Sequence, residues 1–182
     1  LAPWLHEPAD RPVAADQVID LTSRVTAEGG LEWDVPPGRW TIIRTGHRMT
    51  GSRVMIPPPE AAGLSIDWLS NEGVELQFQH LGEMFLADAK AVGTKLAYFC
   101  DDSFEDGFPN WTEKIVERFK HYRGYDPVPY LPVLSGYIVG SAEISDRFLY
   151  DYRKTVADCM ADGHYGRFAE LCHENGLAVQ NE

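Results

Sequence analysis

Carboxylate side chains are concentrated at one point of the sequence, the run Asp101-Asp102-Ser103-Phe104-Glu105-Asp106, which directly follows an apolar segment ending at Cys100. Another carboxylate, Glu182, follows Gln180 and Asn181 after the apolar residues 177–179. Hydrolysis of a glycosidic bond needs one carboxylic acid to protonate the leaving oxygen and one carboxylate to act as nucleophile or to activate water. Neighbouring carboxylates also separate in pKa, so that one is protonated while the other is ionised. The same oxygen-rich cluster could equally hold a hard cation such as calcium.

Only part of this acidic run is a candidate for chemistry. Asp101 and Asp106 are interpreted as loop charge that precedes the next helix. Glu105, with Asp102 and Ser103 beside it, is the candidate part of the run. Glu105 is a candidate because a second carboxylate, Glu182, follows a separate apolar segment.

The apolar segments before these acidic residues are predicted to be strands of one parallel sheet. The predicted elements follow the order strand, helix, strand, helix, irregular segment, helix, strand, which is typical of a parallel sheet with helical crossovers. The sequence contains neither G-x-G-x-x-G nor G-x-x-x-x-G-K, which disfavours an open dinucleotide-binding sheet. We therefore predict an α/β fold that is part of a (β/α)8 TIM-type barrel. The functional residues of such barrels lie at the carboxyl ends of the strands.

The clearest helical pattern precedes the acidic run. Apolar residues from Val74 to Val92 recur at spacings of three or four, which predicts an amphipathic helix. Ser70 is a suitable N-cap and Gly93 a suitable end.

Two further helices are predicted towards the carboxyl end of the chain. Asn110 and Glu113 form a capping pair for a helix that Gly124 ends. A longer helical stretch begins near Ser145, continues past an interruption at residues 163–166, and ends at Gly176.

A short β-hairpin region is predicted before the barrel. Residues 31–35 alternate apolar and polar side chains, Pro36-Pro37-Gly38 supplies the turn, and residues 40–44 return. We accordingly divide the chain into an N-terminal β or irregular segment, residues 1–39, and the first part of a truncated barrel, residues 40–182. The proline-containing segment 128–134 is predicted to be irregular or an edge strand.

Composition restricts the class of partner. The net charge is −12 with no basic cluster, so nucleic acid and anionic membrane surfaces are excluded as expected partners. No apolar run reaches the ~20 residues that span a bilayer. Five Trp and eight Tyr in an acidic chain suit a neutral carbohydrate ligand. The three cysteines are interpreted as small core residues, and the cellular compartment stays open between an extracytoplasmic and a cytoplasmic bacterial location.

Four stretches resemble the catalytic region of glycoside hydrolase family 106, the α-L-rhamnosidases. In chain order they are LEWDVPPGRWTIIRTGHRMTG, GLSIDWLS, DDSFEDGFPNWTEKIVERFKHYRGYDPVPYLPVLSG and RFLYDYRKTVAD. The most specific pieces are the Asp-Ser-aromatic-Glu with the Asn-Trp-Thr that follows it, and the Arg-Gly-Tyr-Asp with its Leu-Pro pair. The similarity runs collinearly from about Leu31 to Glu182.

The resemblance implies a (β/α)8 catalytic domain with accessory β domains. It implies hydrolysis of terminal α-L-rhamnosyl linkages with inversion of configuration, assisted by a bound calcium ion. At matching positions, Glu105 and Glu182 become the candidate catalytic carboxylates, with Glu105 either the partner of Glu182 or a ligand of calcium and sugar. The expected metal ligands are Asp102 and Glu105. The expected substrate contacts are His47, Ser103, Trp111 and Asn181, although core packing is the competing role for Trp111.

The catalytic domains of this family are much longer than this chain. We therefore expect a fragment of a barrel that is inactive alone. An incomplete barrel exposes an unpaired sheet edge and apolar surface, which favours association.

Three other interpretations remain open. Asn181-Glu182 also resembles the acid/base pair of retaining barrel glycosidases such as β-galactosidases, whose carboxyl groups are ~5–5.5 Å apart. A non-catalytic carbohydrate-binding module on a degenerate barrel is a second possibility. A structural domain that binds calcium without hydrolysis is the third.

Overall fold

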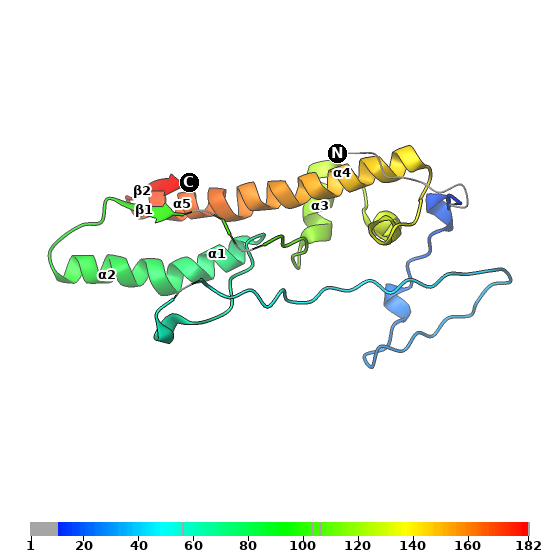
Figure 1. The fold of residues 1–182 in the computed structure, drawn as a ribbon, viewed down its shortest axis with the longest axis horizontal. Helices are drawn as coiled ribbons and strands as arrows, with labels where there is room; N and C mark the ends of the chain where they lie inside the picture. The colour runs from blue at the N-terminus through cyan, green and yellow to red at the C-terminus, as the bar shows by residue number, and fades with distance from the viewer. Residues whose placement is uncertain (1–10, 56, 103, 106, 182) are drawn as a thin grey trace. The chain divides into compact units, whose positions relative to one another are not determined.

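A computed structural model of the chain describes residues 11–55, 57–102, 104–105 and 107–181 (Figure 1). The chain forms two compact units, each assembled from two separate segments. The first unit comprises Leu1–Gly46 and Phe119–Arg153, and the second comprises His47–Arg118 and Lys154–Glu182. Because these units do not test the predicted boundary between residues 39 and 40, that division stays a prediction.

The second unit contains a parallel pair of strands, β1 (Tyr98–Asp101) and β2 (Ala178–Asn181). Tyr98 lies opposite Ala178 and Asp101 opposite Asn181. Both predicted strands and their parallel pairing are confirmed. This two-stranded sheet is the one sheet in the part of the chain that the structure describes, so the architecture is a mixed helix and strand arrangement and the predicted barrel is not confirmed.

The core of the second unit forms where helices cover this sheet. Phe78, Cys172 and Leu177 are buried there, and the side chains packed against them come from the helices and from both strands. The packed residues are Leu86, Leu96, Phe99, Phe168, Leu171 and Val179. Burial raises the pKa of the Cys172 thiol, and the negative charge of Asp101 adds to this effect. Cys159 and Cys172 are core residues as predicted, whereas Cys100 is exposed.

The predicted helix after Ser70 is confirmed, with one irregularity. It consists of α1 (Asn71–Gln77), a π-helical segment (Phe78–Gly82) and α2 (Glu83–Ala91). The Gly73 N–H donates to Ser70 Oγ at 3.0 Å, as expected of an N-cap, and Gly93 follows the helix with φ +76°. A Cβ on Gly82 would lie 3.1 Å from the Phe78 ring, so glycine leaves room for this core aromatic.

The predicted long helical stretch at the carboxyl end is also confirmed. It comprises α4 (Ala142–Cys159), a second π-helical segment (Met160–Gly166) and α5 (Arg167–Glu174). Gly176, with φ +71°, lies at its end. The Arg167 guanidinium joins α5 to α1 through Glu75 at 2.7 Å. Hydrophobic periodicity predicts neither π-helical segment, because the apolar spacing is that of a continuous α-helix.

The start of α3 (Ile115–Arg123) corrects the sequence prediction. The helix begins beyond both Asn110 and Glu113, so these residues are not its capping pair. The backbone carbonyl of Thr112 accepts from the Ile115 N–H at 3.1 Å, and a turn therefore precedes the helix. Gly124, with φ +78°, ends α3 as predicted.

The first unit has an aromatic core around α3 and α4. Phe119 and Phe148 are buried with ring centroids 5.7 Å apart. Residues 128–134, predicted to be irregular or an edge strand, belong to a 3-10 helix (Val128–Ser135). Prolines lack the N–H that a strand ladder needs and have the φ of a helix, which explains this correction. Short 3-10 helices also occur at Ala15–Gln17, Thr22–Arg24 and Pro59–Ala61.

The predicted hairpin at residues 31–44 does not form strands. Trp33 and Trp40 meet across the turn with ring centroids 5.2 Å apart, and the Trp40 indole N–H donates to the Pro36 carbonyl at 2.8 Å. The two arms form no ladder with each other, and the bridge that Leu31 does form goes to Val25, which precedes the predicted hairpin. A hairpin is marginal without a third element against its apolar face, and the apolar side chains of these arms stay largely exposed.

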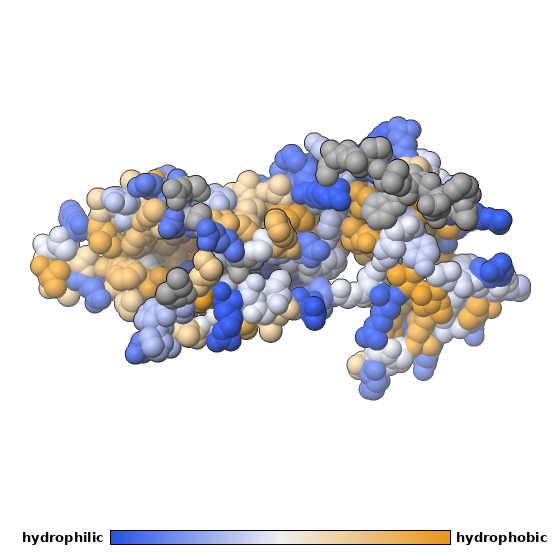
Figure 2. All heavy atoms as spheres, in the orientation of Figure 1, coloured by the Kyte–Doolittle hydropathy of each residue, from blue (hydrophilic) through white to orange (hydrophobic). Residues whose placement is uncertain are grey.

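Apolar side chains also remain exposed in the second unit. Along α1, the π-helical segment and α2 they are Leu76, Leu81, Met84 and Phe85. Figure 2 shows apolar and charged side chains interspersed over the visible face of the molecule. None of the described helices has both the length and the apolar character needed to cross a membrane.

We expect Gly73→Ala to destabilise α1 although alanine favours helices. A Cβ on Gly73 would lie 2.5 Å from the backbone oxygen of Asp67, and relieving such a clash costs ~1–3 kcal/mol. Native-state hydrogen exchange of the α1 amides should accelerate roughly 5- to 150-fold. The exposed Gln77→Ala in the same helix is the control, with rates expected within about twofold. Unchanged exchange in Gly73→Ala would contradict this close approach.

Candidate functional site

The candidate site lies at the carboxyl end of the two-stranded sheet. Asp101 is the last residue of β1 and lies opposite Asn181, the last residue of β2. The acidic run therefore begins at the same end of the sheet as Asn181. Asp102 and Glu105 follow β1 in an exposed loop. Ser103, Asp106 and Glu182 were also singled out in the sequence, and they lie outside the described residues. The structure thus brings the Glu105 loop and Asn181 to one sheet end.

Asp101 is not ordinary loop charge, which corrects the sequence interpretation. It is the last residue of β1, and its Oδ2 lies 2.8 Å from Nε2 of His164. Both side chains are largely removed from solvent, with 17% of Asp101 and 7% of His164 exposed. His164 comes from the π-helical segment Met160–Gly166. Sequence analysis missed it, and the available signal was the glycine interruption at residues 163–166.

Trp68 connects the same histidine to the acidic loop. Its ring lies 4.7 Å from the His164 ring and 5.4 Å from the Phe104 ring, both in edge-to-face geometry. Phe104 immediately precedes Glu105 in the chain. Trp68 therefore packs against the loop that carries the predicted catalytic carboxylate.

The segment around Trp68 is itself anchored by Asp67. The Leu69 N–H donates to Asp67 Oδ1 at 3.0 Å, and the Thr112 hydroxyl donates to Oδ2 at 2.6 Å. Thr112 is buried, with 4% of its surface exposed. Hydrogen bonds to an ionised carboxylate are stronger than neutral ones, so this contact fixes the Trp68 backbone against residue 112. No sequence pattern indicated the pairing.

His47 and Trp111, both predicted to contact substrate, lie against each other. Their rings are stacked with centroids 5.5 Å apart and 16° between the planes. His47 is exposed, whereas Trp111 is half-buried and its indole N–H has no partner among the described residues. One face of the indole is therefore occupied by His47 rather than open to a sugar ring.

The described residues do not by themselves complete a calcium site. Asp102 and Glu105 supply the hard oxygen donors that calcium prefers, but the ion takes about 6–8 oxygen ligands. Among the described residues, no three His, Cys, Asp or Glu side chains are grouped to hold a metal ion. The donor chemistry agrees with the prediction and the number of donors falls short.

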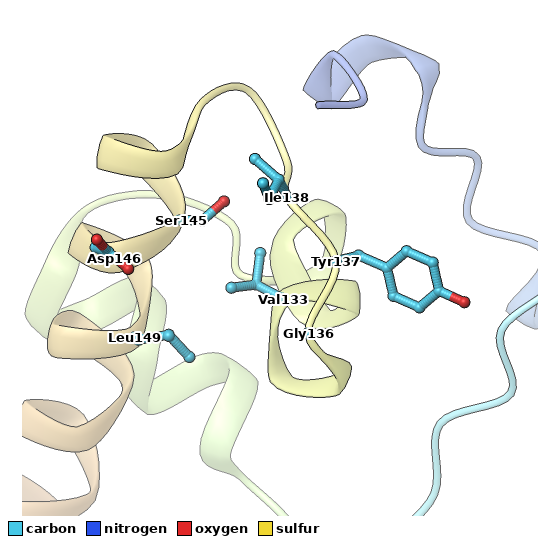
Figure 3. Close-up of a pocket in the computed structure, with 7 residues that line it drawn as sticks. All are labelled: Val133, Gly136, Tyr137, Ile138, Ser145, Asp146 and Leu149. Atoms are coloured by element: carbon cyan, nitrogen blue, oxygen red, sulfur yellow. The ribbon is translucent and has the colours of Figure 1, made fainter. Parts of the chain in front are cut away.

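A cavity in the first unit is not a sugar site. It has a volume of ≈ 10 Å³ and lies between the 3-10 helix Val128–Ser135 and α4 (Figure 3). Ligand pockets usually measure about 300–1,000 Å³. Its lining is largely apolar, and the Ser145 hydroxyl donates to the Val139 carbonyl at 3.1 Å. This cavity is a packing gap about the size of one water.

An acidic loop and a polar residue at the ends of paired parallel strands suit a glycoside hydrolase, and the comparisons with known proteins agree with that class. The model of glycoside hydrolase family 106, described as alpha-L-rhamnosidase, matches residues 4–182. The chain belongs to this family, and the predicted membership is confirmed.

Two relatives extend over nearly the whole chain. A solved rhamnosidase from Novosphingobium sp. PP1Y is 38% identical with a TM-score of 0.82, covering 94% of this chain and 17% of that one. A protein of Formosa agariphila named putative beta-glucuronidase is 39% identical over 176 residues, covering 96% of this chain and 15% of the relative. The chain thus spans less than a fifth of the length of either relative.

We expect Thr112→Val to loosen the anchor of Trp68. The change removes the hydroxyl that donates to Asp67 and leaves Leu69 N–H as the donor seen on that carboxylate. Loss of a hydrogen bond to a charged group costs ~1.5–3 kcal/mol in a buried site and less here, because Asp67 is exposed. Exchange of the Leu69 amide should accelerate about tenfold.

Thr112→Ser is the matched control, because it keeps the hydroxyl and loses only a methyl group. Its Leu69 amide should exchange within about threefold of the native rate. Equal acceleration in the valine and serine variants would show that methyl packing, not the hydrogen bond, holds the segment.

Proposed function

We propose that the whole protein is an inverting glycoside hydrolase that cleaves terminal α-L-rhamnosyl linkages of plant or microbial glycans. The observation that carries the proposal is the placement of the Glu105 loop and Asn181 at one end of the sheet. Membership of the α-L-rhamnosidase family supports the substrate class. The likeness to the solved rhamnosidase supports it further.

Glu105 and Glu182 are proposed as the active-site carboxyl groups. In an inverting reaction, one protonates the leaving oxygen and the other takes a proton from a water on the opposite face of the sugar, across a gap of roughly 6.5–9.5 Å. Glu105 is exposed in its loop, so it is accessible to a sugar. Glu182 is proposed as the acid or the base, with Glu105 as its partner or as a ligand of calcium and sugar.

Neutral polar contacts are proposed for the rest of the sugar. His47, Ser103, Trp111 and Asn181 supply hydrogen-bond donors, acceptors and aromatic surface, which suit hydroxyl groups and the apolar face of a sugar ring. Asp102 and Glu105 are proposed as part of a calcium site that further ligands complete. When bound, the ion would supply positive charge next to substrate oxygens.

This part of the protein is proposed to be inactive alone and to need the remainder of the protein. Apolar side chains stay exposed along α1 and α2, and a two-stranded sheet offers unpaired backbone groups at its edges. Isolated, the segment is proposed to associate through these surfaces.

A β-glucuronidase is the second candidate, favoured by the name of the Formosa agariphila relative. A glucuronide differs from a rhamnoside in carrying a carboxylate. Its recognition would require a cationic side chain, whereas this chain is acidic overall, with a net charge of −12. The two candidates therefore differ in the charge of the sugar that they accept.

The intact enzyme should hydrolyse an aryl α-L-rhamnoside and leave an aryl β-D-glucuronide uncleaved. Proton NMR of the first product should show inverted configuration at the anomeric carbon, because water attacks the sugar directly. Glu105→Gln should lower kcat roughly 10²- to 10⁴-fold, the usual contribution of a general acid or base. The same assay after chelation tests the calcium proposal, with a fall in activity that added calcium restores.

Glu83→Gln is the matched control for Glu105→Gln, since Glu83 is an exposed carboxylate at the start of α2. Its kcat should stay within about twofold of the native value. A retained anomer in the first product would overturn the inverting mechanism. Cleavage of the glucuronide alone would replace the proposed substrate with the second candidate.

A further inference from the structure

His164 is a buried polar residue that the proposed chemistry does not use. Only 7% of its side chain is exposed, and Nε2 lies 2.8 Å from Asp101 Oδ2. A carboxylate only accepts hydrogen bonds, so Nε2 carries the hydrogen and donates it. The other ring nitrogen, Nδ1, is buried without a protein partner among the described residues. A buried polar group with half of its hydrogen bonding unmet calls for an explanation other than stability.

The partner of His164 begins the loop that leads to Glu105. Asp101 is the last residue of β1, and the chain passes from it through Asp102 to Phe104 and Glu105. The hydrogen bond from His164 therefore fixes the point at which the loop leaves the sheet. Asp102 and Glu105 themselves are exposed, so burial does not hold them.

A second contact with this loop, three residues after Asp101, comes from Trp68. The indole packs edge-on against His164 at 4.7 Å and against Phe104 at 5.4 Å. Phe104 is adjacent to Glu105, so one aromatic ring links the histidine to the residue beside the candidate carboxylate. The loop is thus restrained at Asp101 by a hydrogen bond and at Phe104 by ring contact, and both restraints involve His164.

The backbone around His164 is shaped for this position. The residue lies in a π-helical segment, a helix irregularity that occurs frequently at functional sites. A Cβ on the preceding Gly163 would lie 3.1 Å from the Leu69 carbonyl oxygen. Glycine therefore allows the π-helical segment to approach the backbone next to Trp68 closely. A larger residue at position 163 would require the neighbouring backbone to shift.

We propose that His164 is a positioning residue, which orients the Glu105 loop through its hydrogen bond to Asp101 and its contact with Trp68. The inference deepens the proposed function, because it rests on Glu105 being an active-site carboxyl group. His164 touches neither the sugar nor the reacting atoms in this role. It acts by limiting the positions that Glu105 occupies relative to the substrate.

Kinetics of His164 variants in the intact enzyme test this role. His164→Leu removes the donor, and we expect kcat on the aryl α-L-rhamnoside to fall about 10- to 100-fold, because small misplacements of a catalytic group cost up to ~10² in rate. KM should change less than about threefold, because the variant keeps the contacts that bind the substrate in its ground state. His164→Gln places an amide N–H near the position of Nε2 and should recover kcat to within about fivefold of native.

Asp101→Leu, which removes both acceptor oxygens at a similar size, tests the other side of the hydrogen bond. Its kcat should fall as in His164→Leu, and the double variant should be no worse than either single change, because one interaction is being removed. His173→Gln, at an exposed histidine of α5, is the control and should leave both constants unchanged. An additive double variant, or native kcat in folded His164→Leu, would overturn the proposal.

Hydrogen exchange of the peptide spanning residues 101–107 provides a measurement independent of turnover. Exchange should accelerate about tenfold in His164→Leu and stay near native in His164→Gln. If the native enzyme cleaves no rhamnoside while exchange responds in this way, the proposed function fails and the positioning role stands. If exchange in both variants equals that of the native protein, the positioning role fails whatever the enzyme hydrolyses.

Discussion

The parallel pairing of β1 with β2 is the interaction on which the candidate site depends. It joins Tyr98 to Ala178 and Asp101 to Asn181, two segments separated by most of the carboxyl half of the chain. A parallel pair requires a long crossover, which explains why helices fill the sequence between the strands. The register decides the chemistry as well. A slip of one residue would turn every side chain of a strand to the opposite face and would detach Asp101 from His164.

Packing beneath the sheet keeps that pairing in place and also supports the site. Phe78, Cys172 and Leu177 are buried together, and Phe78 sits in one of the two π-helical segments. The other π-helical segment carries His164. The same irregular helices therefore supply apolar contacts to the sheet and a polar contact to its carboxyl end. This arrangement couples the stability of the core to the position of the Glu105 loop.

Hydrophobic periodicity was enough to predict the helices after Ser70 and near Ser145, both strands and their parallel pairing, because those features are repeated along the sequence. Contacts between distant single residues carry no such repeat. Asp101 was therefore interpreted as a charged loop residue. No pattern in the sequence predicted the hydrogen bond between Thr112 and Asp67. The hairpin at residues 31–44 failed for another reason: alternating side chains specify strands only where a neighbouring surface buries one face. The predicted barrel is not confirmed by the described residues, and Glu182 lies outside them.

The exposure of Glu105 poses a physical problem for the proposed chemistry. A carboxyl group must be open to reach a sugar, yet proton transfer needs it held close to the reacting oxygen. Burial, the usual source of rigidity, would close the site. In this chain the restraint falls on nearby residues instead, since the half-buried Asp101 and Phe104 are held through His164 and Trp68. The segment that carries Trp68 is in turn held by the hydrogen bond from Thr112 to Asp67. The loop that carries Glu105 is thus restrained by contacts of neighbouring residues, although Glu105 itself is exposed.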